Sequence, residues 1–325
     1  MKEIRWGMIG CGDVTEVKSG PAFNKARGSR LVAVMRRDEE KVKDYAERHG
    51  VPKWYTDAEE LINDEEVDAV YIATPPSSHA LYTIMAANAG KPVYVEKPMA
   101  MTLSQCGEMV NVCKDADVPL FVAYYRRMLP SFLKVKEIVE SGTIGEVRGV
   151  NIRLYWAPKP EDIKGDPNNW RVKKSISGGG YFHDLASHQF DFLDYVLGPI
   201  ANAGGINHNQ AGFYNAPDIT TAAFNFESGV VGSGIWCFTA DKSSQIDMTE
   251  IIGSKGTVKF PSFDLSKPVM LTSSSGNEGF RFDNPEHIQQ PLIQSIVDEL
   301  NGGAPCPSKG ESAMRTSNVL DLITA

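Results

Sequence analysis

The chain has 325 residues, 42% of them hydrophobic, and a formal net charge of −8 with an isoelectric point near 5.4. This length and apolar content favour two domains, because a single hydrophobic core rarely serves so long a chain. The acidic balance, with no lysine-rich or arginine-rich block, argues against nucleic acid as a partner, since binding to a phosphate backbone needs positive charge.

The five cysteines are odd in number and contain no Cys-x-x-Cys pair, so neither a disulfide framework nor a zinc site is indicated. The N-terminus lacks the apolar core of a signal peptide, and no segment approaches the roughly 20 apolar residues of a membrane span. We therefore expect a soluble, cytoplasmic protein with reduced thiols and no membrane partner.

The first third of the chain alternates short apolar runs with longer amphipathic stretches, which is typical of strands and crossover helices in a parallel sheet. The predicted strands are residues 4–9, 29–35, 69–73, 93–95 and 120–123, and the predicted helices are residues 39–49, 77–89 and 104–116. This pattern predicts a doubly wound, dinucleotide-binding Rossmann domain over residues 1–122, and hence an α/β fold.

The pattern changes after residue 122, where a predicted helix over 130–141 precedes β-branched or alternating segments typical of antiparallel sheets. The predicted strands are residues 146–156, 220–226, 230–238, 246–252 and 256–260, with a hairpin turn at 226–229 and a flexible loop at 273–276. We predict a second, α+β domain over residues 123–325. A last predicted helix is still in progress at 320–325, so we expect that the native chain can extend further.

A glycine-rich segment, Gly10-Cys11-Gly12-Asp13-Val14-Thr15, lies between the first predicted strand and a predicted helix. In that context Gly10 allows a tight turn, Gly12 lets the backbone approach a pyrophosphate, and the start of the helix, with Asp13 and Val14, attracts its negative charge. Thr15 replaces the usual third small residue, so we expect looser packing of helix on strand. An ordinary glycine turn is the alternative, and the strand-turn-helix context favours the dinucleotide.

The choice of nucleotide is expected at the end of the second strand, where Arg36 and Arg37 stand. A carboxylate at this position accepts hydrogen bonds from the ribose hydroxyls of NAD, whereas an arginine binds the phosphate of NADP. We therefore predict NADP, with NAD possible. The alternative is that both arginines are solvated surface residues beside Asp38 and its acidic neighbours.

Thr74 and Pro75 follow the predicted strand at 69–73, at the edge of the sheet where loops meet a cofactor. His79, a few residues later, is a candidate cofactor contact, although a histidine in the first turn of a helix is at least as often a surface residue. We assign it no catalytic role.

Glu96-Lys97-Pro98 follows the buried strand at 93–95. A lysine held at a strand end beside a cofactor loses solvation, has a lowered pKa and takes part in proton transfer. Glu96 is a candidate to orient Lys97 or to contact the cofactor. A surface Glu-Lys pair is the alternative, and the tripeptide alone does not exclude it.

The segment Gly178-Gly179-Gly180 precedes Asp184 and His188, which lie four residues apart and share one face of a predicted helix. A carboxylate beside an imidazole orients it and tunes its charge, and the glycines permit a close approach of the backbone to a ligand. A core histidine is possible but leaves the glycines without a purpose. A zinc site is a minor alternative, because His183 and His188 point to different sides of the helix.

The order of these motifs, with Trp170-Arg171 between the last two, resembles the glucose-fructose oxidoreductase, inositol dehydrogenase and MocA (Gfo/Idh/MocA) family over nearly the whole chain. The resemblance implies a C-terminal domain with a large, open, mostly antiparallel sheet, through which members commonly pair as homodimers or homotetramers. It implies Lys97, Asp184 and His188 as the catalytic residues. It also implies that Tyr125, Trp170 and Arg171 border the cofactor or substrate.

Two positions depart from the family pattern. Arg36 stands where NAD-using members tend to have an acid, which favours NADP, and Tyr125 stands where an asparagine is frequent, which puts that contact in doubt. An aromatic and polar wall suited to a carbohydrate is predicted from Tyr155, Trp156, Trp170, Arg171 and Tyr181, although the same residues suit ordinary sheet packing.

The resulting hypothesis is an oxidoreductase that transfers a hydride between the nicotinamide and a sugar, polyol, keto-sugar or cyclic diol. His188 accepts the proton of the substrate hydroxyl, and Lys97 polarises the oxygen or relays the proton. A glycosidase that keeps its dinucleotide through a redox cycle and a non-catalytic dinucleotide sensor are the alternatives. Release of reduced cofactor separates the first from a dehydrogenase, and the complete set of proton-transfer residues argues against the second.

Overall fold

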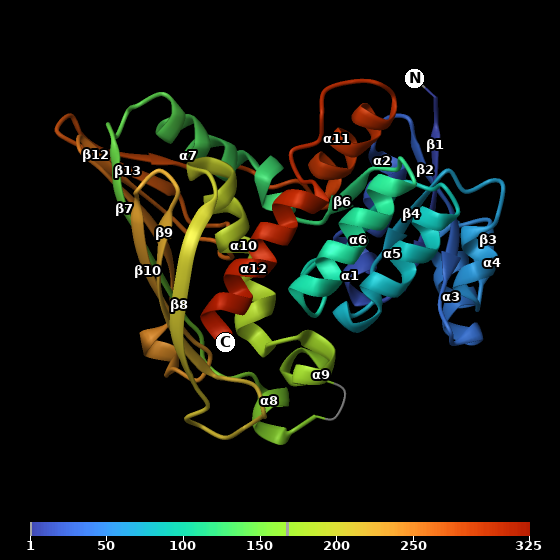
Figure 1. Cartoon of the computed structure of the whole chain (residues 1–325), viewed down its shortest axis with the longest axis horizontal. Helices are drawn as coiled ribbons and strands as arrows, with labels where there is room; N and C mark the ends of the chain where they lie inside the picture. The colour runs from blue at the N-terminus through green and yellow to red at the C-terminus, as the bar shows by residue number, and fades with distance from the viewer. Residues whose placement is uncertain (1, 167–168) are drawn as a thin grey trace. The chain divides into compact units, whose positions relative to one another are not determined.

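The computed structural model describes residues 2–166 and 169–325 (Figure 1). The chain forms two compact units. The first contains the residues up to Tyr125 together with Pro285–Met314, and the second contains Arg126–Asn284 together with Arg315–Ala325.

The division differs from the sequence-based one at Pro285–Met314, which the sequence placed with the second domain. The helix α11 (Gln290–Leu300) explains the difference. Its side chains Leu292, Ile293 and Ile296 are fully buried, and it packs with α2 (Gly20–Lys25) of the first unit. Because this apolar face is buried against the first unit, the segment Pro285–Met314 belongs to that unit.

The first unit contains a sheet of six parallel strands in the order β3-β2-β1-β4-β5-β6. The strands are β1 (Ile4–Ile9), β2 (Ser29–Met35), β3 (Lys53–Tyr55), β4 (Ala69–Ile72), β5 (Val93–Val95) and β6 (Leu120–Val122). This is the strand order of a Rossmann domain, so the predicted fold is confirmed. β3 was not predicted, because Lys53-Trp54-Tyr55 is short and only partly buried.

Helices join these strands. They are α1 (Asp13–Val17), α2, α3 (Glu39–His49), α4 (Ala58–Ile62), α5 (His79–Asn88) and α6 (Leu103–Asp115), with a 3-10 turn η1 (Pro76–Ser78) before α5. The predicted bounds of α3 are confirmed, and its caps explain them. Asp38 accepts a hydrogen bond from the backbone N–H of Lys41, and Gly50 ends the helix at φ 63°.

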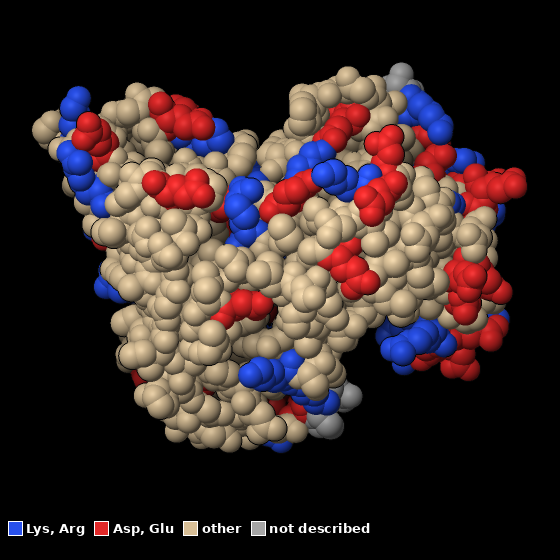
Figure 2. Space-filling view, in the orientation of Figure 1, with Lys and Arg blue, Asp and Glu red and all other residues tan. Residues whose placement is uncertain are grey.

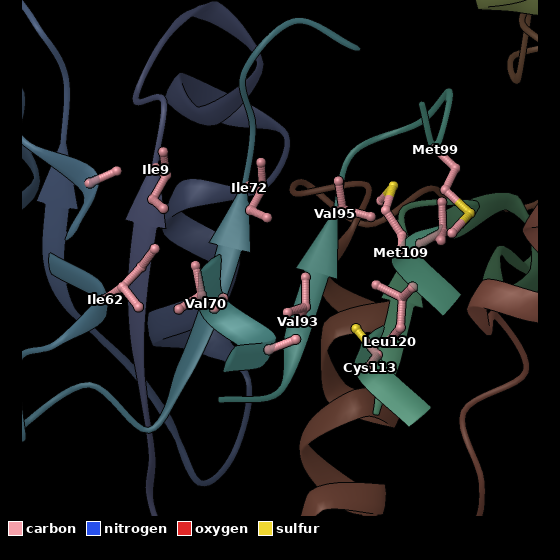
Figure 3. Close-up of a cluster of buried hydrophobic side chains, with 14 of the residues drawn as sticks. Ile9, Ile62, Val70, Ile72, Val93, Val95, Met99, Met109, Cys113 and Leu120 are labelled. Carbon is pink, nitrogen blue, oxygen red and sulfur yellow. The ribbon is translucent and has the colours of Figure 1, made fainter. Parts of the chain in front are cut away.

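The core of the first unit gathers β-branched side chains from the central strands (Figure 3). Ile72, Val93 and Val95 are fully buried there, with Met109 and Cys113 of α6. Continuous apolar runs of this kind are what a parallel sheet covered on both faces requires. The core therefore holds the carboxyl ends of the strands, where the candidate residues lie, on a rigid base.

The second unit contains an eight-stranded sheet in the order β14-β13-β12-β11-β7-β10-β9-β8. The strands are β7 (Val147–Tyr155), β8 (Ile200–His208), β9 (Ile219–Phe226), β10 (Val231–Cys237), β11 (Ile246–Gly253), β12 (Gly256–Phe260), β13 (Val269–Ser273) and β14 (Gly276–Phe280). Only β7 and β10 pair in parallel, so the predicted mostly antiparallel sheet is confirmed. The loop predicted at 273–276 is the tip of the β13–β14 hairpin.

One face of this sheet packs against the long helix α10 (Gly180–Leu197). Trp236 of β10 is fully buried between Phe182 and Phe190 of α10, with ring centroids 5.1 and 5.5 Å away, and it donates a hydrogen bond to Gln189. α7 (Pro130–Glu140) adds Phe132, which packs on Phe260. The remaining helices of the second half of the chain are α8 (Pro160–Lys164), α9 (Lys174–Ser177) and α12 (Gly310–Thr324).

The opposite face of the sheet carries exposed apolar side chains, among them Ile206, Val231 and Ile252. On the face of the molecule drawn in Figure 2, acidic and basic side chains are interspersed. Among the described residues, no helix has both the length and the apolar content that crossing a bilayer requires. The five cysteines are free thiols.

Candidate active site

The turn after β1 has the conformation that its glycines predict. Gly10 has φ 94°, and a Cβ at this position would lie 2.7 Å from Thr74 Cγ2 and 2.9 Å from Thr74 N. The loops that follow β1 and β4 therefore touch at Gly10. By contrast, a Cβ on Gly12 would meet no described atom within 4 Å. Gly12 is the N-cap of α1, so open space lies beside the backbone where Asp13 and Val14 begin the helix. This cradle fits a pyrophosphate.

Thr15, which was expected to loosen the packing of its helix on the strand, is itself held firmly. Thr15 is fully buried, its hydroxyl donates to the Gly12 carbonyl at 2.8 Å, and its own carbonyl accepts a hydrogen bond from Tyr45 at 2.9 Å. The close approach is made instead at Gly20, where a Cβ would lie 2.2 Å from the Thr15 carbonyl oxygen. Gly20 is a residue that the motif search missed.

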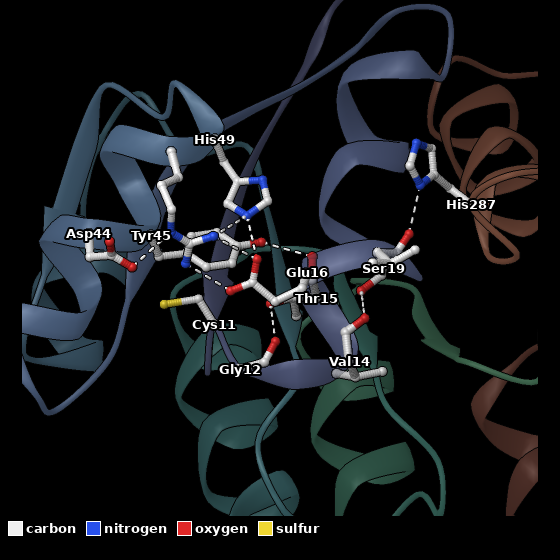
Figure 4. Close-up of polar contacts among 12 residues, drawn as sticks. Cys11, Gly12, Val14, Thr15, Glu16, Ser19, Asp44, Tyr45, His49 and His287 are labelled. Atoms are coloured by element: carbon white, nitrogen blue, oxygen red, sulfur yellow. Dashed lines mark hydrogen bonds and ion pairs between the residues drawn. The ribbon is translucent and has the colours of Figure 1, made fainter.

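An ion-pair cluster ties α1 to α3 beside the glycine-rich turn (Figure 4). Glu16 accepts hydrogen bonds from Arg48 at 2.9 Å on both oxygens, and its Oε2 lies 2.8 Å from His49 Nε2. The hydrogen bond with Arg48 is the main reason that the pKa of Glu16 is lowered to about 2. The His49 ring stacks on Tyr45 with centroids 4.1 Å apart. The helix that opens the cradle is therefore anchored to the helix that follows β2.

Arg36 lies at the end of β2 and reaches the glycine-rich turn. Its Nη1 donates to the Cys11 carbonyl oxygen at 3.0 Å, while Arg37 is exposed. The nearest carboxylate in sequence, Asp38, caps α3 and pairs with Lys41 Nζ at 2.7 Å. A guanidinium, rather than a carboxylate, thus stands beside the backbone of the turn.

The segment after β4 places Thr74 and Pro75 at the same edge of the sheet, both half-buried. His79 differs from its expected role. Its ring is fully buried, with one nitrogen 2.7 Å from the Thr74 carbonyl oxygen and the other 3.0 Å from the Pro98 carbonyl oxygen. Burial lowers the pKa of His79. The residue joins two loops, and contact between its ring and a cofactor would require the ring to leave this position.

Glu96 and Lys97 follow β5 at the edge where the other candidate loops lie. Glu96 is only 7% exposed, and its Oε1 lies 2.8 Å from Tyr71 Oη and 2.6 Å from Gln289 Nε2, both of which donate to it. Lys97 is half-buried and precedes a cis peptide bond to Pro98. The sequence analysis missed Gln289, which stands far along the chain and has no motif around it. Glu96 Oε2 also accepts the backbone N–H of Lys97 at 3.2 Å, so Glu96 ties the start of this loop to Tyr71 and Gln289.

The acid and imidazole predicted for the second domain lie on α10. Asp184 and His188 are one turn apart, with the His188 residue 3% exposed and the Asp184 side chain 15% exposed. Arg171 Nε lies 3.6 Å from Asp184 Oδ2, and the Arg171 guanidinium lies 4.7 Å from the centre of the Trp170 ring. Trp170 and Arg171 begin the 3-10 turn η3 (Trp170–Val172). The structure thus brings Trp170, Arg171 and Asp184 into one cluster, with His188 one turn further along α10.

The three glycines before α10 have a local purpose, which corrects the expectation that only a ligand explains them. Gly178 and Gly180 have φ values of 86° and 73°. A Cβ on Gly179 would lie 2.1 Å from the His183 ring, and a Cβ on Gly180 would lie 2.5 Å from Ala216 Cβ. The glycines therefore let the chain turn sharply into α10 and let His183 pack against it. Burial, with a smaller contribution from Lys174, lowers the pKa of His183 to about 4.

The remaining candidates are distributed between the two units. Tyr125 is buried, ends the first unit and begins the 3-10 turn η2 (Tyr125–Met128). Tyr181 is a core residue whose hydroxyl donates to Asp162 at 2.9 Å, so it does not stand in an open wall, whereas Tyr155 and Trp156 are half-buried. Among the described residues, no group of three or more histidine, cysteine or acidic side chains is arranged to hold a metal ion.

The order of the parallel strands, the cradle at Gly12 and the acid and imidazole on α10 are the features of a dinucleotide-dependent oxidoreductase. A family model described as an oxidoreductase family with an NAD-binding Rossmann fold matches residues 4–124, and a GFO/IDH/MocA C-terminal domain model matches residues 132–259. The chain belongs to the Gfo/Idh/MocA oxidoreductase family.

Full-length relatives agree with this membership. The chain is 41% identical over 321 residues to oxidoreductase P35 of Formosa agariphila, covering 98% of each chain. It is 30% identical over 324 residues to a myo-inositol 2-dehydrogenase of Thermotoga maritima, covering 95% of this chain and 91% of the relative. A solved levoglucosan dehydrogenase with NADH and levoglucosan has the same fold, with a TM-score of 0.86, 22% identity and coverage of 99% of this chain and 96% of the other.

Proposed function

We propose that this protein transfers a hydride between a nicotinamide dinucleotide, with NADP favoured, and a CH–OH group of a sugar, polyol, keto-sugar or cyclic diol. The observation that carries the proposal is the placement of Asp184 and His188 one turn apart on α10, with Arg171 beside the carboxylate. The names of the relatives support the substrate class, since they include a dehydrogenase of a cyclic polyol and a structure with an anhydro sugar.

The cofactor, when bound, supplies or accepts the hydride. In the oxidising direction, a ring nitrogen of His188 accepts the proton of the substrate hydroxyl, and the Asp184 carboxylate stabilises the imidazolium that results. Lys97 Nζ donates a hydrogen bond to the same oxygen and offsets the negative charge that develops on it. In the reducing direction, protonated His188 or Lys97 returns the proton. Lys97 belongs to the first unit and His188 to the second.

The remaining residues hold the ligands. Gly10, Gly12, Asp13 and Val14 form the pyrophosphate cradle, while Thr74, Pro75 and Glu96 line the same sheet edge and Tyr125, Trp170 and Arg171 border the cofactor or substrate. Arg36 supports NADP, because it places a guanidinium at the end of β2 while Asp38 is engaged in capping α3. Arg37, which is exposed, is the second phosphate contact in this proposal.

We also propose that the protein is a homodimer or homotetramer that pairs through the outer face of the eight-stranded sheet. The strand register aligns Ile206, Thr221, Ile235, Arg153 and Met248 in one row across five strands. Ile206 is 66% exposed and Ile235 is 37% exposed. A sheet face with exposed apolar side chains is the kind of surface that a second copy covers.

The decisive experiment titrates the purified protein with NADP(H) and NAD(H) and then measures turnover on a panel of keto-sugars, sugars and polyols. The expected result is tight binding of NADP(H) and formation of free reduced cofactor with at least one member of the panel. Binding without turnover would point to the sensor, and hydrolysis of a glycoside without release of reduced cofactor would point to the glycosidase. Failure to bind either dinucleotide would overturn the proposal.

The roles of the two proton-transfer residues are tested with His188→Gln and Lys97→Met. General acid-base catalysis contributes roughly 10²- to 10⁴-fold to a rate, so each variant should lose about that much turnover while dinucleotide affinity changes little. Equal losses of turnover and of affinity would contradict the assignment. Replacement of an exposed histidine, His208→Gln, is the matched control.

A further inference from the structure

An aromatic ring beside the candidate imidazole comes from a loop that no motif marks. Phe263 follows β12, and its ring centroid lies 6.2 Å from that of His188 at an interplanar angle of 70°. This edge-to-face contact places an apolar surface against one side of the imidazole. Because His188 is almost fully buried, the contact limits how its ring can turn.

Phe263 is itself held from two directions. The Arg126 guanidinium lies 4.6 Å from the centre of its ring, and the Trp156 ring packs edge-on with centroids 5.4 Å apart. A buried guanidinium over an aromatic face is a favourable contact, because the ring carries partial negative charge on its faces. The Phe263 ring is thus fixed between a cation and an aromatic neighbour.

The backbone of the Phe263 loop is clamped by one buried carboxylate. Asp247 of β11 accepts hydrogen bonds from three consecutive backbone N–H groups, those of Ser262 at 2.9 Å, Phe263 at 2.6 Å and Asp264 at 2.8 Å. Arg126 Nε donates to the Ser262 carbonyl oxygen at 2.7 Å. Charge-assisted bonds of this kind are about twice as strong as neutral ones. The loop therefore has little freedom to move Phe263.

The helix that carries His188 is secured by the residue next to Arg126. Arg127 donates to Asp191 through Nε at 2.8 Å and through Nη2 at 2.6 Å, and both side chains are nearly fully buried. Asp191 lies three residues after His188, almost one turn further along α10. Two adjacent arginines thus hold the two parts of the aromatic contact: Arg126 holds the Phe263 loop and Arg127 holds the His188 helix.

We propose that Phe263, fixed by Asp247, is a positioning residue for the His188 imidazole. The inference rests on the proposed function, in which His188 accepts the substrate proton. Phe263 packs against one side of the imidazole and holds it in one orientation, so that a ring nitrogen is kept in place to exchange its proton with the substrate. Asp247 acts one step further away, by holding the loop.

The test compares kcat, KM and dinucleotide affinity in three variants with two matched controls. Phe263→Leu removes the aromatic edge, Phe263→Tyr keeps it, and Asp247→Asn removes the charge of the clamp. Phe280→Leu is the control for the ring, because Phe280 also lies under a cation, Lys134, at 4.6 Å but is on the outer strand β14. Asp218→Asn is the control for the clamp, because Asp218 also accepts two consecutive backbone N–H groups.

A small displacement of a catalytic group costs up to roughly 100-fold in rate, so Phe263→Leu should lower kcat by about 10- to 100-fold. Asp247→Asn should have a smaller effect in the same direction. Phe263→Tyr keeps the aromatic ring beside His188, so its kcat should stay within about threefold of that of the unmodified protein. Dinucleotide affinity and the melting temperature of the Phe263 variants should match those of the Phe280→Leu control.

A spectroscopic readout keeps the test independent of turnover. The chain has six histidines, so a protein labelled on its histidine rings gives few enough signals to assign His188 by its loss in His188→Gln. Phe263→Leu should shift the His188 ring signal, since the neighbouring ring current is removed, and Phe280→Leu should not. An unshifted signal, or a kcat unchanged from that of the controls, would overturn the inference.

The two proposals fail in different ways. If the unmodified protein turns over no substrate, or if His188→Gln is fully active, the proposed function fails. If His188→Gln is inactive but Phe263→Leu equals Phe280→Leu in kcat, only the positioning role fails.

Discussion

Gln289 Nε2 donates a hydrogen bond to Glu96 Oε1 at 2.6 Å, although 193 residues separate the two in sequence. Gln289 Oε1 accepts a hydrogen bond from Tyr94 at 2.6 Å, so the amide satisfies two buried groups at once. Gln289 is fully buried at the N-cap of α11. The Glu96-Lys97 segment thus depends on a residue from the far end of the chain.

Replacement of that amide should destabilise the first unit. Gln289→Leu leaves the Glu96 carboxylate and the Tyr94 hydroxyl each without one buried partner, which should cost about 1–3 kcal/mol of unfolding free energy. Denaturant unfolding measures the change. Gln294→Leu is the control, since Gln294 bonds Arg27 N in an exposed position and its loss should cost far less. Equal losses in the two variants would contradict a special role for Gln289.

The two glycines of the first turn should respond differently to alanine. Gly12→Ala meets open space, so its melting temperature should be unchanged while its dinucleotide affinity falls by roughly tenfold, equal to about 1.4 kcal/mol. Gly10→Ala meets Thr74 and has a positive φ, so the fold itself should lose about 1–3 kcal/mol. Calorimetry for binding and thermal unfolding for stability separate the two effects, and a stable Gly12→Ala with full affinity would argue against the cradle.

Arg36 should determine nucleotide preference. Arg36→Ala removes a charge-assisted contact to the phosphate of NADP, worth about 1.5–3 kcal/mol, so NADP(H) affinity should fall roughly 10- to 100-fold while NAD(H) affinity changes little. The exposed Arg30 of β2 provides the control substitution, Arg30→Ala. An equal loss of affinity for both dinucleotides would show that Arg36 stabilises the turn through its hydrogen bond to Cys11 and does not contact the phosphate of NADP.

His183 should make stability depend on pH. Its pKa is lowered to about 4 by burial, below the ordinary value of 6.5, so the folded chain binds fewer protons than the unfolded chain between these values. Stability should therefore be fully present above pH 6.5 and fall as the pH drops towards 4, by about 3 kcal/mol in total. His183→Gln should flatten this slope in melting curves from pH 8 to pH 4. His208→Gln, at an exposed histidine, should leave the slope unchanged.

The proposed association of two copies through the outer face of the eight-stranded sheet is tested by a substitution in the middle of that face. Ile235→Lys places a charge beside Arg153 in the row of aligned side chains, and an unpaired charge buried in an interface is strongly unfavourable. Light scattering after size-exclusion chromatography should therefore show a lower mass than for the unmodified protein. Leu133→Lys, at a comparably exposed leucine on α7, should leave the mass unchanged. A monomeric unmodified protein would refute the pairing.

Local signals in the sequence account for much of the fold. The strand at 29–35 and the helix at 39–49 were predicted to their bounds, because an apolar run and the caps Asp38 and Gly50 act within a few residues. β8 was missed, because its segment Ile200–His208 has two adjacent glycines and exposed residues on both faces, so it lacks the alternation of a half-buried strand. Its pairing with β9 decides its structure.

The candidate site divides in the same way. Spacing alone indicated that Asp184 and His188 share a turn, and position after a strand indicated Arg36. The partners Phe263 and Gln289 have no local signature, because each acts through a contact with a residue remote in sequence. The purpose of the glycines before α10 could not be predicted either, because it lies in the contact between the His183 ring and Gly179.

The first unit is built from two separate parts of the chain, the residues up to Tyr125 and Pro285–Met314, and this affects how the protein folds during synthesis. The six strands of the parallel sheet are synthesised first. Gln289 and the apolar face of α11 are synthesised only after all eight strands of the second sheet. Until then the apolar surface that α11 covers is exposed and Glu96 lacks its hydrogen bond from Gln289, so the two units should complete their folding together rather than in order of synthesis.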